Sequence, residues 1–337
     1  MNNHAIAYVA NADSQDIWIL NLDRTRGTLE LIGKVDAGGA VMPLAPSPGK
    51  RFLYASLRSK PFSVASFAID VRTGALFRIG TAPLPDSMAN IMVDRTGRWL
   101  FAASYGGDKI SVSPIGEDGV AQAATTVLPT GKNAHAAIID ARNRHLYVTN
   151  LGSDEVRQFR FDAATGKLTP NDPPAFKARA GAGPRHLVIH PDAKHAYLLN
   201  ELDATVDLLA IDAHDGTLSL IKTWPTLPAG SDAKPWAADI HLTPDGRFLY
   251  TSERNTSTLA MWKVDEATRE LALIGHEPTE QQPRGFQIDS TGQWLLAVGQ
   301  VSNRMTAYRI DPATGRLSPH AQQPMGKNPN WVEIVDL

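Results

Sequence analysis

"RFLYASLRSKPFSVASFAID", residues 51–70, is one copy of a pattern that returns along the whole chain. Each copy opens with a polar or basic residue and a short apolar run, then passes through a polar turn into an alternating run. Similar segments begin at residues 98, 144, 194, 247 and 293, so the spacing is 46 to 53 residues. A seventh copy, "AIAYVANADSQDIWILNLD" at residues 5–23, lacks the lead-in of the others.

Every period contains four β-rich runs separated by turn sequences. A turn such as "TGKL" at 165–168 follows the alternating run and leads into a third run, and the fourth run ends in a hairpin sequence such as "TPDGR" at 243–247. Short alternating runs between such turns are typical of strands. Seven repeats of four strands favour a seven-bladed β-propeller. We therefore predict an all-β fold of antiparallel four-stranded blades, forming one domain over residues 1–337.

The two ends of the chain predict how the ring closes. The tail "NPNWVEIVDL" at 328–337 aligns with "GPRHLVIHPD" at 183–192, the first and innermost strand of a blade. The N-terminus begins at the second strand of a blade. We therefore expect residues 331–336 to pair with residues 6–11, because a shared blade removes the exposed sheet edges.

Composition limits the classes of function. Hydrophobic residues make up 43% of the chain and charged residues 20%, which is enough apolar material for a core. The formal net charge of −2 provides no overall field for nucleic acid, and the absence of cysteine excludes disulfides and thiolate sites. Because no run of the sequence is long and apolar enough to span a membrane, we expect a cytoplasmic protein. A closed propeller has no obligatory partner surface, so we expect a monomer or a weak homo-oligomer.

Antiparallel order places two sets of connections on one face of a propeller: those that precede the first strand of each blade and those that follow its second strand. The residues in the slot before the first strand are Met42, Ala89, His135, Arg185, Ala238, Arg284 and Asn330. The residues in the slot after the second strand are Ala12, Arg58, Tyr105, Leu151, Glu201, Arg254 and Gln300. Four arginines and one glutamate would therefore converge on the mouth of the central channel. Guanidinium groups suit carboxylates and phosphates, so a small anionic molecule is the expected ligand.

Each of these residues also has a purely structural interpretation. Arg185 could bridge two blades, His135 could be a hydrogen-bonded structural histidine, and Glu201 could be only an ion-pair partner of an arginine. The last interpretation is compatible with catalysis, because a neighbouring arginine keeps a carboxylate ionised and able to accept a proton.

The other histidines do not predict a metal site. His186 and His190 are four residues apart, which on a strand separates them by roughly 13 Å. We expect His190 and His195 to be exposed polar residues beside a hairpin on the opposite face, and His241 to be structural. No nucleotide-binding, metal-binding or serine-hydrolase motif occurs in the sequence. We therefore predict no metal and no cofactor, and the remaining chemistry is water activated by a side-chain base.

Several segments carry a resemblance to a known family. They are "GAGPRH" at 181–186, "NEL" at 200–202, "WAADIHLTPDGR" at 236–247, "QPRGF" at 282–286, "AVGQ" at 297–300 and "PNW" at 329–331. Together, and in this order, they resemble the bacterial 6-phosphogluconolactonases of the seven-bladed lactonase family. That family is similar in turn to fungal 3-carboxy-cis,cis-muconate lactonizing enzymes. One departure is the alanine on each side of His135, where the enterobacterial lactonases have cysteine and serine.

The resemblance implies catalytic roles for His135, Arg185, Glu201 and Arg254. In the mechanism that we expect, Glu201 or His135 deprotonates water and the two arginines stabilise the oxyanion of an opening lactone. The residues expected to bind the substrate are Arg58, Tyr105, Lys132, Arg284, Gln300 and Asn330, with Arg58, Arg284 and Lys132 holding a distal phosphate.

Two other functions stay open at this point. One is a lactonizing or delactonizing enzyme for a muconate or an unphosphorylated sugar acid. The other is a non-enzymatic propeller, which predicts an exposed apolar patch on the loop face in place of an arginine-lined funnel.

Overall fold

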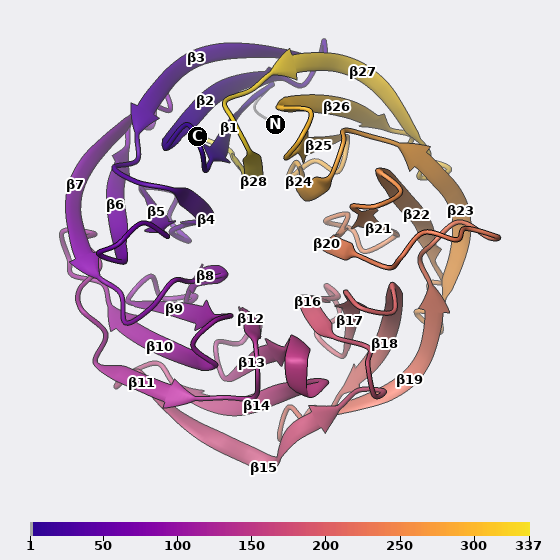
Figure 1. Cartoon of the computed structure of the whole chain (residues 1–337), viewed down its shortest axis with the longest axis horizontal. Coiled ribbons are helices and arrows are strands. Elements are labelled where there is room, and N and C mark those ends of the chain that lie inside the picture. The colour runs from indigo at the N-terminus through magenta and orange to yellow at the C-terminus, as the bar shows by residue number, and fades with distance from the viewer. Residues whose placement is uncertain (1–2) are drawn as a thin grey trace.

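The computed structural model of the chain describes residues 3–337, and within that range the polypeptide forms 28 β-strands in seven antiparallel sheets of four. The sheets stand around a central axis, each with one strand at the axis and one at the outer rim (Figure 1). The predicted seven-bladed β-propeller is confirmed. One short 3-10 turn, Leu151–Ser153, follows the second strand of one blade.

The strands of each sheet are given from the axis outward. The sheet that contains both chain ends consists of β28 (Pro329–Val335), β1 (His4–Asn11), β2 (Asp16–Asp23) and β3 (Thr28–Asp36). The two sheets after it consist of β4 (Val41–Pro46), β5 (Phe52–Leu57), β6 (Ser63–Ile69) and β7 (Leu76–Pro83); and of β8 (Asn90–Val93), β9 (Trp99–Ser104), β10 (Lys109–Pro114) and β11 (Thr126–Pro129). The next two are β12 (Ala134–Ile139), β13 (His145–Asn150), β14 (Glu155–Asp162) and β15 (Lys167–Lys177); and β16 (Pro184–Ile189), β17 (His195–Asn200), β18 (Thr205–Ile211) and β19 (Leu218–Pro225). The last two are β20 (Ala237–Leu242), β21 (Phe248–Glu253), β22 (Thr258–Val264) and β23 (Leu271–Pro278); and β24 (Pro283–Ile288), β25 (Trp294–Gly299), β26 (Arg304–Ile310) and β27 (Leu317–Pro324).

The predicted closure of the ring is also confirmed. Strand β28 pairs antiparallel with β1, and the register joins Ile6 to Val335 and Ala10 to Trp331. The strand ends at Val335, one residue before the predicted boundary. Asp336 lies beyond the ladder and instead binds the guanidinium group of Arg24.

Neighbouring blades are joined by a repeated hydrogen bond. The hydroxyl of Tyr8 on β1 donates to the carbonyl of Gly74 in the β6–β7 turn of the next blade, at 2.9 Å. Gly74 has a φ of +74°, and a Cβ there would come within 2.7 Å of Ile6, so the turn requires glycine. Equivalent bonds link Tyr54 to Gly119, Tyr147 to Gly216, Tyr197 to Arg269 and Tyr250 to Gly315.

The apolar core lies between adjacent sheets. Phe101 of β9 and Phe161 of β14 belong to neighbouring blades, and their rings meet edge to face at 4.9 Å. Along the axis, all seven innermost strands surround a cavity of about 540 Å³. Each innermost strand therefore contributes side chains to the wall of this cavity, while others, such as Val41 of β4, pack into the core between the sheets.

Candidate active site

A β-bulge occurs in most of the innermost strands, close to the end that carries the predicted slot. The pairing with the second strand skips His135 in β12, Arg185 in β16 and Arg284 in β24. These residues therefore lie inside the strands and not in the loops before them, which corrects the sequence analysis. A bulge leaves one residue out of the ladder and redirects its side chain.

Thr149 on β13 supports two of these bulges. Its hydroxyl accepts a hydrogen bond from the amide of Ala136 at 3.0 Å and donates one to the carbonyl of Arg185 at 2.7 Å. The side chain is fully buried. One hydroxyl thus fixes the backbone beside His135 in its own blade and at Arg185 in the next.

The second predicted slot lies where the sequence placed it. Each of its residues directly follows the second strand of its blade; Glu201 comes after β17 and Arg254 after β21. These positions are at the same face as the bulges, because the first and second strands are antiparallel.

An ion-pair triad joins the two slots. Arg185 Nε and Arg254 Nη2 both lie 2.8 Å from Oε2 of Glu201. Both arginine side chains are almost completely buried, and the Glu201 side chain is 12% exposed. Burial alone would raise the pKa of Glu201, but the charges of Arg185 and Arg254 outweigh it and hold that pKa below its ordinary value. The carboxylate is therefore ionised at neutral pH, and its Oε1 atom has no hydrogen-bond partner within residues 3–337.

Arg254 is fixed by a cage of backbone and aromatic groups. Its Nε donates to the carbonyl of Trp236 at 3.1 Å and Nη2 donates to that of Ala237 at 3.0 Å. The guanidinium carbon lies 4.0 Å from the centre of the Trp236 ring, a cation–π contact. Burial and the charge of Arg185 lower the pKa of Arg254 to about 10, so the group stays cationic at neutral pH.

His135 lies beside this triad as a buried, neutral histidine. It is 4% exposed, its ring is 5.1 Å from that of His186 and 6.0 Å from that of Tyr105, and its Nδ1 has no partner among the described residues. Burial and the positive charge of Arg185 hold the pKa of His135 well below its ordinary value.

Two further arginines meet at Met42. Arg58 Nη1 lies 3.3 Å and Arg284 Nη2 lies 3.4 Å from the sulfur of that residue. Within residues 3–337, Arg284 forms no ion pair with a carboxylate. Burial and the charges of Arg185 and Arg254 hold its pKa well below the ordinary value, and Arg58 contributes in the same direction, so three guanidinium groups lie within electrostatic reach of Arg284.

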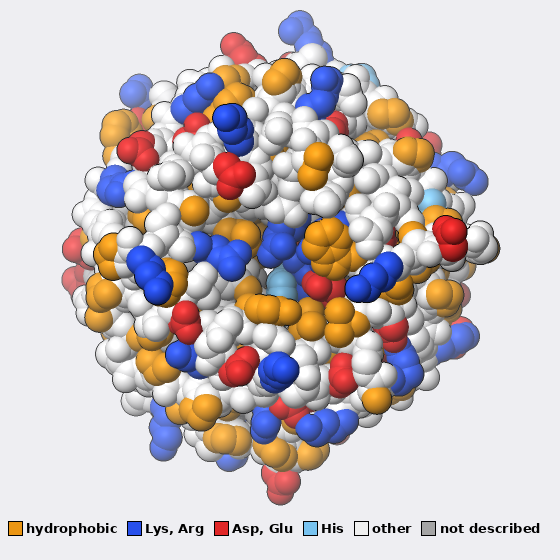
Figure 2. Space-filling view, in the orientation of Figure 1, with side chains coloured by type: hydrophobic (Ala, Val, Ile, Leu, Met, Phe, Trp, Pro, Cys, Tyr) orange, Lys and Arg blue, Asp and Glu red, His pale blue; other side chains and the backbone are white. Residues whose placement is uncertain are grey.

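Figure 2 shows this face, with Lys and Arg side chains gathered at a central hollow and a histidine visible inside it. Four guanidinium groups lie here near the carboxylate of Glu201, and they belong to Arg58, Arg185, Arg254 and Arg284.

The structure places the other predicted binding residues less uniformly. Tyr105 is 38% exposed beside His135. Gln300 donates to the side chain of Asn328 at 2.8 Å. Asn330 is fully buried and donates to the backbone carbonyls of Asn328 and Val41. Lys132 is exposed, and its ammonium group forms no hydrogen bond or ion pair with the described residues.

The sequence analysis missed a second ring of polar groups directly below the triad. His186 of β16 and Asp239 of β20 are joined at 2.7 Å, and His241 lies 3.3 Å from the same carboxylate. An alignment of the residue that follows each position of the first slot would have placed Asn90, His186, Asp239 and Trp331 in one ring around the axis. His190 is only 5% exposed and contacts Asp192, so its expected exposure was wrong.

The comparisons with known proteins can be set beside this geometry. The family described as lactonase, 7-bladed beta-propeller, matches residues 4–334. The chain belongs to that family. A 6-phosphogluconolactonase of Serratia proteamaculans is 44% identical over 330 residues, covering 98% of each chain. One of Pectobacterium carotovorum is 42% identical over 332 residues, covering 98% of this chain and 99% of the other.

The fold of this lactonase family member is also that of solved structures. A protein of Bacteroides fragilis is 27% identical and superimposes with a TM-score of 0.92, covering 99% of each chain. Within residues 3–337, no helix is long and apolar enough to cross a membrane.

Proposed function

We propose that this protein hydrolyses 6-phospho-D-glucono-1,5-lactone to 6-phospho-D-gluconate. The observation that carries the proposal is the charge of the hollow, where four guanidinium groups surround one carboxylate in a protein of net charge −2. Such a site suits a substrate that carries a phosphate and that develops a further negative charge during reaction. The full-length similarity to proteins named 6-phosphogluconolactonase supports the same substrate.

In this proposal Glu201 is the general base. Its Oε2 is held by two arginines, while Oε1 is left to bind water. Oε1 accepts a proton as the water oxygen attacks the lactone carbonyl carbon. The tetrahedral intermediate then collapses, the bond from that carbon to the ring oxygen breaks, and the ring oxygen takes the proton from Glu201. The new carboxylic acid loses its proton to solvent, so atoms and charge balance.

Arg185 and Arg254 have the role of oxyanion stabilisers. Both are held rigidly by the groups around them, so their charge needs no reorganisation when the oxyanion forms. Arg284 and Arg58 would bind the phosphate, with Lys132 as an additional exposed cation. His135, which is neutral, would donate or accept a hydrogen bond at the substrate. All of these groups come from one chain, so the site needs no partner subunit.

The test is a coupled assay in which 6-phosphogluconate is oxidised by its dehydrogenase. The measured rate must exceed spontaneous ring opening, and a muconolactone serves as the competing substrate. We expect Arg185→Ala to lower kcat/KM at least about tenfold and Glu201→Gln about a hundredfold, with the fold retained. Glu270→Gln, which removes an exposed partner of Lys222, is the matched control. A rate equal to the spontaneous background, or a preference for the dicarboxylate lactone, would contradict the proposal.

A further inference from the structure

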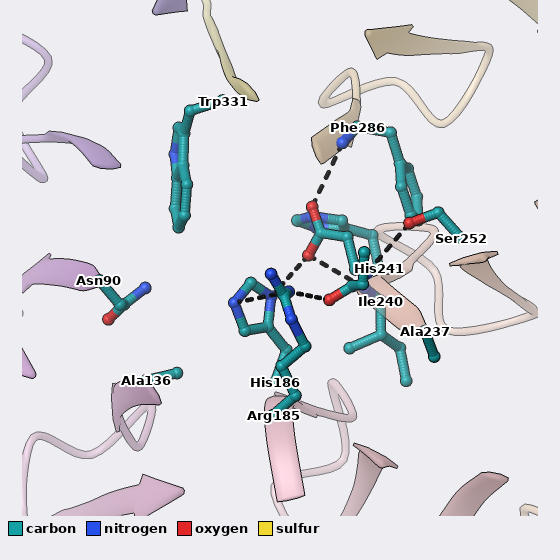
Figure 3. Close-up of polar contacts among 12 residues, drawn as sticks. Asn90, Ala136, Arg185, His186, Ala237, Ile240, His241, Ser252, Phe286 and Trp331 are labelled. Atoms are coloured by element: carbon teal, nitrogen blue, oxygen red, sulfur yellow. Dashed lines mark hydrogen bonds and ion pairs between the residues drawn. The ribbon is translucent and has the colours of Figure 1, made fainter. Parts of the chain in front are cut away.

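A chain of buried polar contacts continues from the triad into the central channel. Arg185 Nη1 lies 3.3 Å from Nε2 of His186, and Nδ1 of the same histidine lies 2.7 Å from Oδ1 of Asp239. Figure 3 shows Arg185 and His186 together, with dashed contacts that reach the neighbouring blade carrying His241. The mechanism above does not use this histidine or this aspartate.

The Asp239 carboxylate is held in one orientation. Oδ1 also accepts the amide of Ile240 at 3.0 Å, and Oδ2 accepts the amide of Phe286 at 3.2 Å. Its second histidine partner, His241, approaches Oδ2 at 3.3 Å. Burial opposes ionisation of Asp239, but His241 and His186 outweigh it and hold the pKa of this carboxyl well below its ordinary value. The carboxylate is therefore an ionised acceptor with a fixed direction.

This fixed acceptor decides the tautomer of His186. Burial and the charge of Arg185 lower the pKa of His186 to about 4, so its ring is neutral at neutral pH. A neutral imidazole has one N–H, and an ionised carboxylate at Nδ1 requires the proton there. Nε2 is then a lone-pair acceptor. Because guanidinium groups only donate, this acceptor is the kind of group that Arg185 Nη1 requires.

The remaining contacts of Arg185 show how its guanidinium group is oriented when Nε2 of His186 accepts from it. Nε is bound to Glu201, and Nη1 also donates to the backbone carbonyl of Ala238. Nη2 forms no hydrogen bond with the described residues. The guanidinium group is therefore held at Nε and at Nη1, on either side of Nη2, and Nη2 is left to bind a ligand.

We propose that His186, oriented by Asp239, is a positioning residue that holds Arg185 with Nη2 directed at the reacting carbonyl. The groups that face the imidazole are Asp239 and His241 from β20, the His135 ring from β12 and the Trp331 ring from β28. Its effect on catalysis rests on the proposed lactonase function, whereas its tautomer does not.

The first experiment measures that tautomer in the whole protein without substrate. Imidazole nitrogen-15 chemical shifts, assigned with the His186→Gln variant, should show a neutral Nδ1–H ring for His186 between pH 6 and 8. In Asp239→Asn the amide can donate to Nδ1, so the proton should move to Nε2. An Nε2–H or charged ring in the unmodified protein would overturn the proposal whatever the enzyme's activity.

The second experiment separates positioning from a simple contact between blades. Asparagine at 186 retains a group near Nδ1 that can bond Asp239, whereas glutamine retains an acceptor near Nε2 for Arg185. We expect His186→Asn and His186→Ala to lower kcat/KM for 6-phosphogluconolactone at least about tenfold, mainly through kcat, and His186→Gln to stay within about threefold. A structural contact alone predicts the reverse order of the asparagine and glutamine variants.

The double variant completes the test. Asp239→Asn should lower kcat at least about tenfold when His186 is present and less than about twofold in the His186→Ala background, because it acts through the histidine. His195→Gln, which removes a His–Asp contact of 2.9 Å at the opposite face of the same blade, should leave the rate unchanged. Additive effects of the two substitutions, or full activity of His186→Asn, would overturn the proposal. Absence of activity in the unmodified protein would instead contradict the proposed function, and the nitrogen-15 shifts would still decide the tautomer.

Discussion

Arg284 is a half-buried cation whose side-chain hydrogen bond goes to the sulfur of Met42, a weak acceptor. Its neighbours Arg185 and Arg254 carry the same charge. Burying a charge without a partner destabilises a folded protein. This residue therefore lowers the free energy of unfolding, and a bound anion would offset that loss. If Arg284 binds the phosphate as proposed, the free protein is less stable because it keeps this charge at the site without a partner.

Replacing Arg284 with methionine should separate these two effects. We expect Tm to rise by about 1 to 2 °C, since a half-buried charge without a carboxylate partner is removed. KM for the phosphorylated lactone should rise at least about tenfold while kcat changes little, because the phosphate is bound equally in the ground and transition states. Thermal unfolding and the coupled assay provide both values.

Arg316→Met is the matched control, because that arginine is exposed. It should change neither value. A lower Tm for Arg284→Met would mean that the guanidinium group stabilises the fold, and an unchanged KM would remove it from the phosphate site.

The protonation states of the site predict a flat activity profile. The pKa of Glu201 is held below its ordinary value, so the base is ionised throughout the range from pH 5 to 7.5. The pKa values of His135 and His186 are lowered as well, so neither ring titrates near pH 6.5. We expect kcat/KM, corrected for spontaneous hydrolysis, to vary less than about twofold over this range. An acid limb near pH 6.5 would instead mean that another group of the channel controls activity, such as His241 or Glu333, whose pKa is raised by burial to about 7.

The same shift has a consequence for stability. Because the pKa of Glu201 is lower in the folded state than in the unfolded state, its contribution is present above about pH 4.5 and is lost as the pH falls through the folded value. Glu201→Gln should therefore weaken the loss of stability between pH 5 and 3. Urea unfolding at fixed pH values measures the difference between the two proteins.

At the scale of single elements, the bulges of the innermost strands create the site. A regular strand would direct alternate side chains to the channel and between the blades. The bulges free His135, Arg185 and Arg284 from that alternation, and Thr149 holds two of the three backbone segments. The geometry of the site therefore depends on backbone contacts as well as on charge.

Thr149→Val tests this dependence with almost no change in shape. The amide of Ala136 loses its acceptor and remains buried, so the free energy of unfolding should fall by about 1 to 3 kcal/mol. Since His135 and Arg185 flank the affected backbone, kcat/KM should fall at least about fivefold. Chemical denaturation and the coupled assay measure the two effects.

Thr149→Ser keeps the hydroxyl and is the control. It should retain kcat/KM within about twofold. An impaired serine variant beside an unimpaired valine variant would show that the methyl group, and not the two hydrogen bonds, is what the bulges need.

The strands and the two slots were predictable because they repeat. Seven copies of one pattern fix the blade, and alignment of the copies places Glu201, Arg185 and Arg254 at one face. The bulges were not predictable, because a residue skipped in a ladder has no signature in a single period. The pairing of His186 with Asp239 was missed for a related reason: the two residues are 53 positions apart and belong to different copies, so only the curvature of the ring brings them together.

At the scale of the whole molecule, closure of the ring makes the site. Its residues come from successive blades between Arg58 and Arg284, and the blade made by β28 with β1, β2 and β3 joins the last of these blades to the first. Arg24 fastens this joint. Its Nε lies 2.7 Å from Oδ2 of the fully buried Asp289, and its Nη2 binds Asp336. Three segments of the chain that are remote in sequence thus meet at one guanidinium group.

Arg24→Ala should weaken the closure and leave the chemistry intact. The Asp289 carboxylate would stay buried with only neutral donors, so the free energy of unfolding should fall by about 2 to 4 kcal/mol. None of the proposed catalytic groups contacts Arg24, so kcat/KM at 25 °C should remain within about twofold.

Lys50→Ala removes a more exposed partner of Asp336, at 3.4 Å, and should lower the free energy of unfolding by less than about 1 kcal/mol. Unfolding by guanidinium chloride measures the stability of both variants. If the two were equally stable, ring closure would rest on the strand pairing of β1 with β28 alone. A large loss of activity in folded Arg24→Ala would instead mean that small movements at this joint reach the arginines of the mouth.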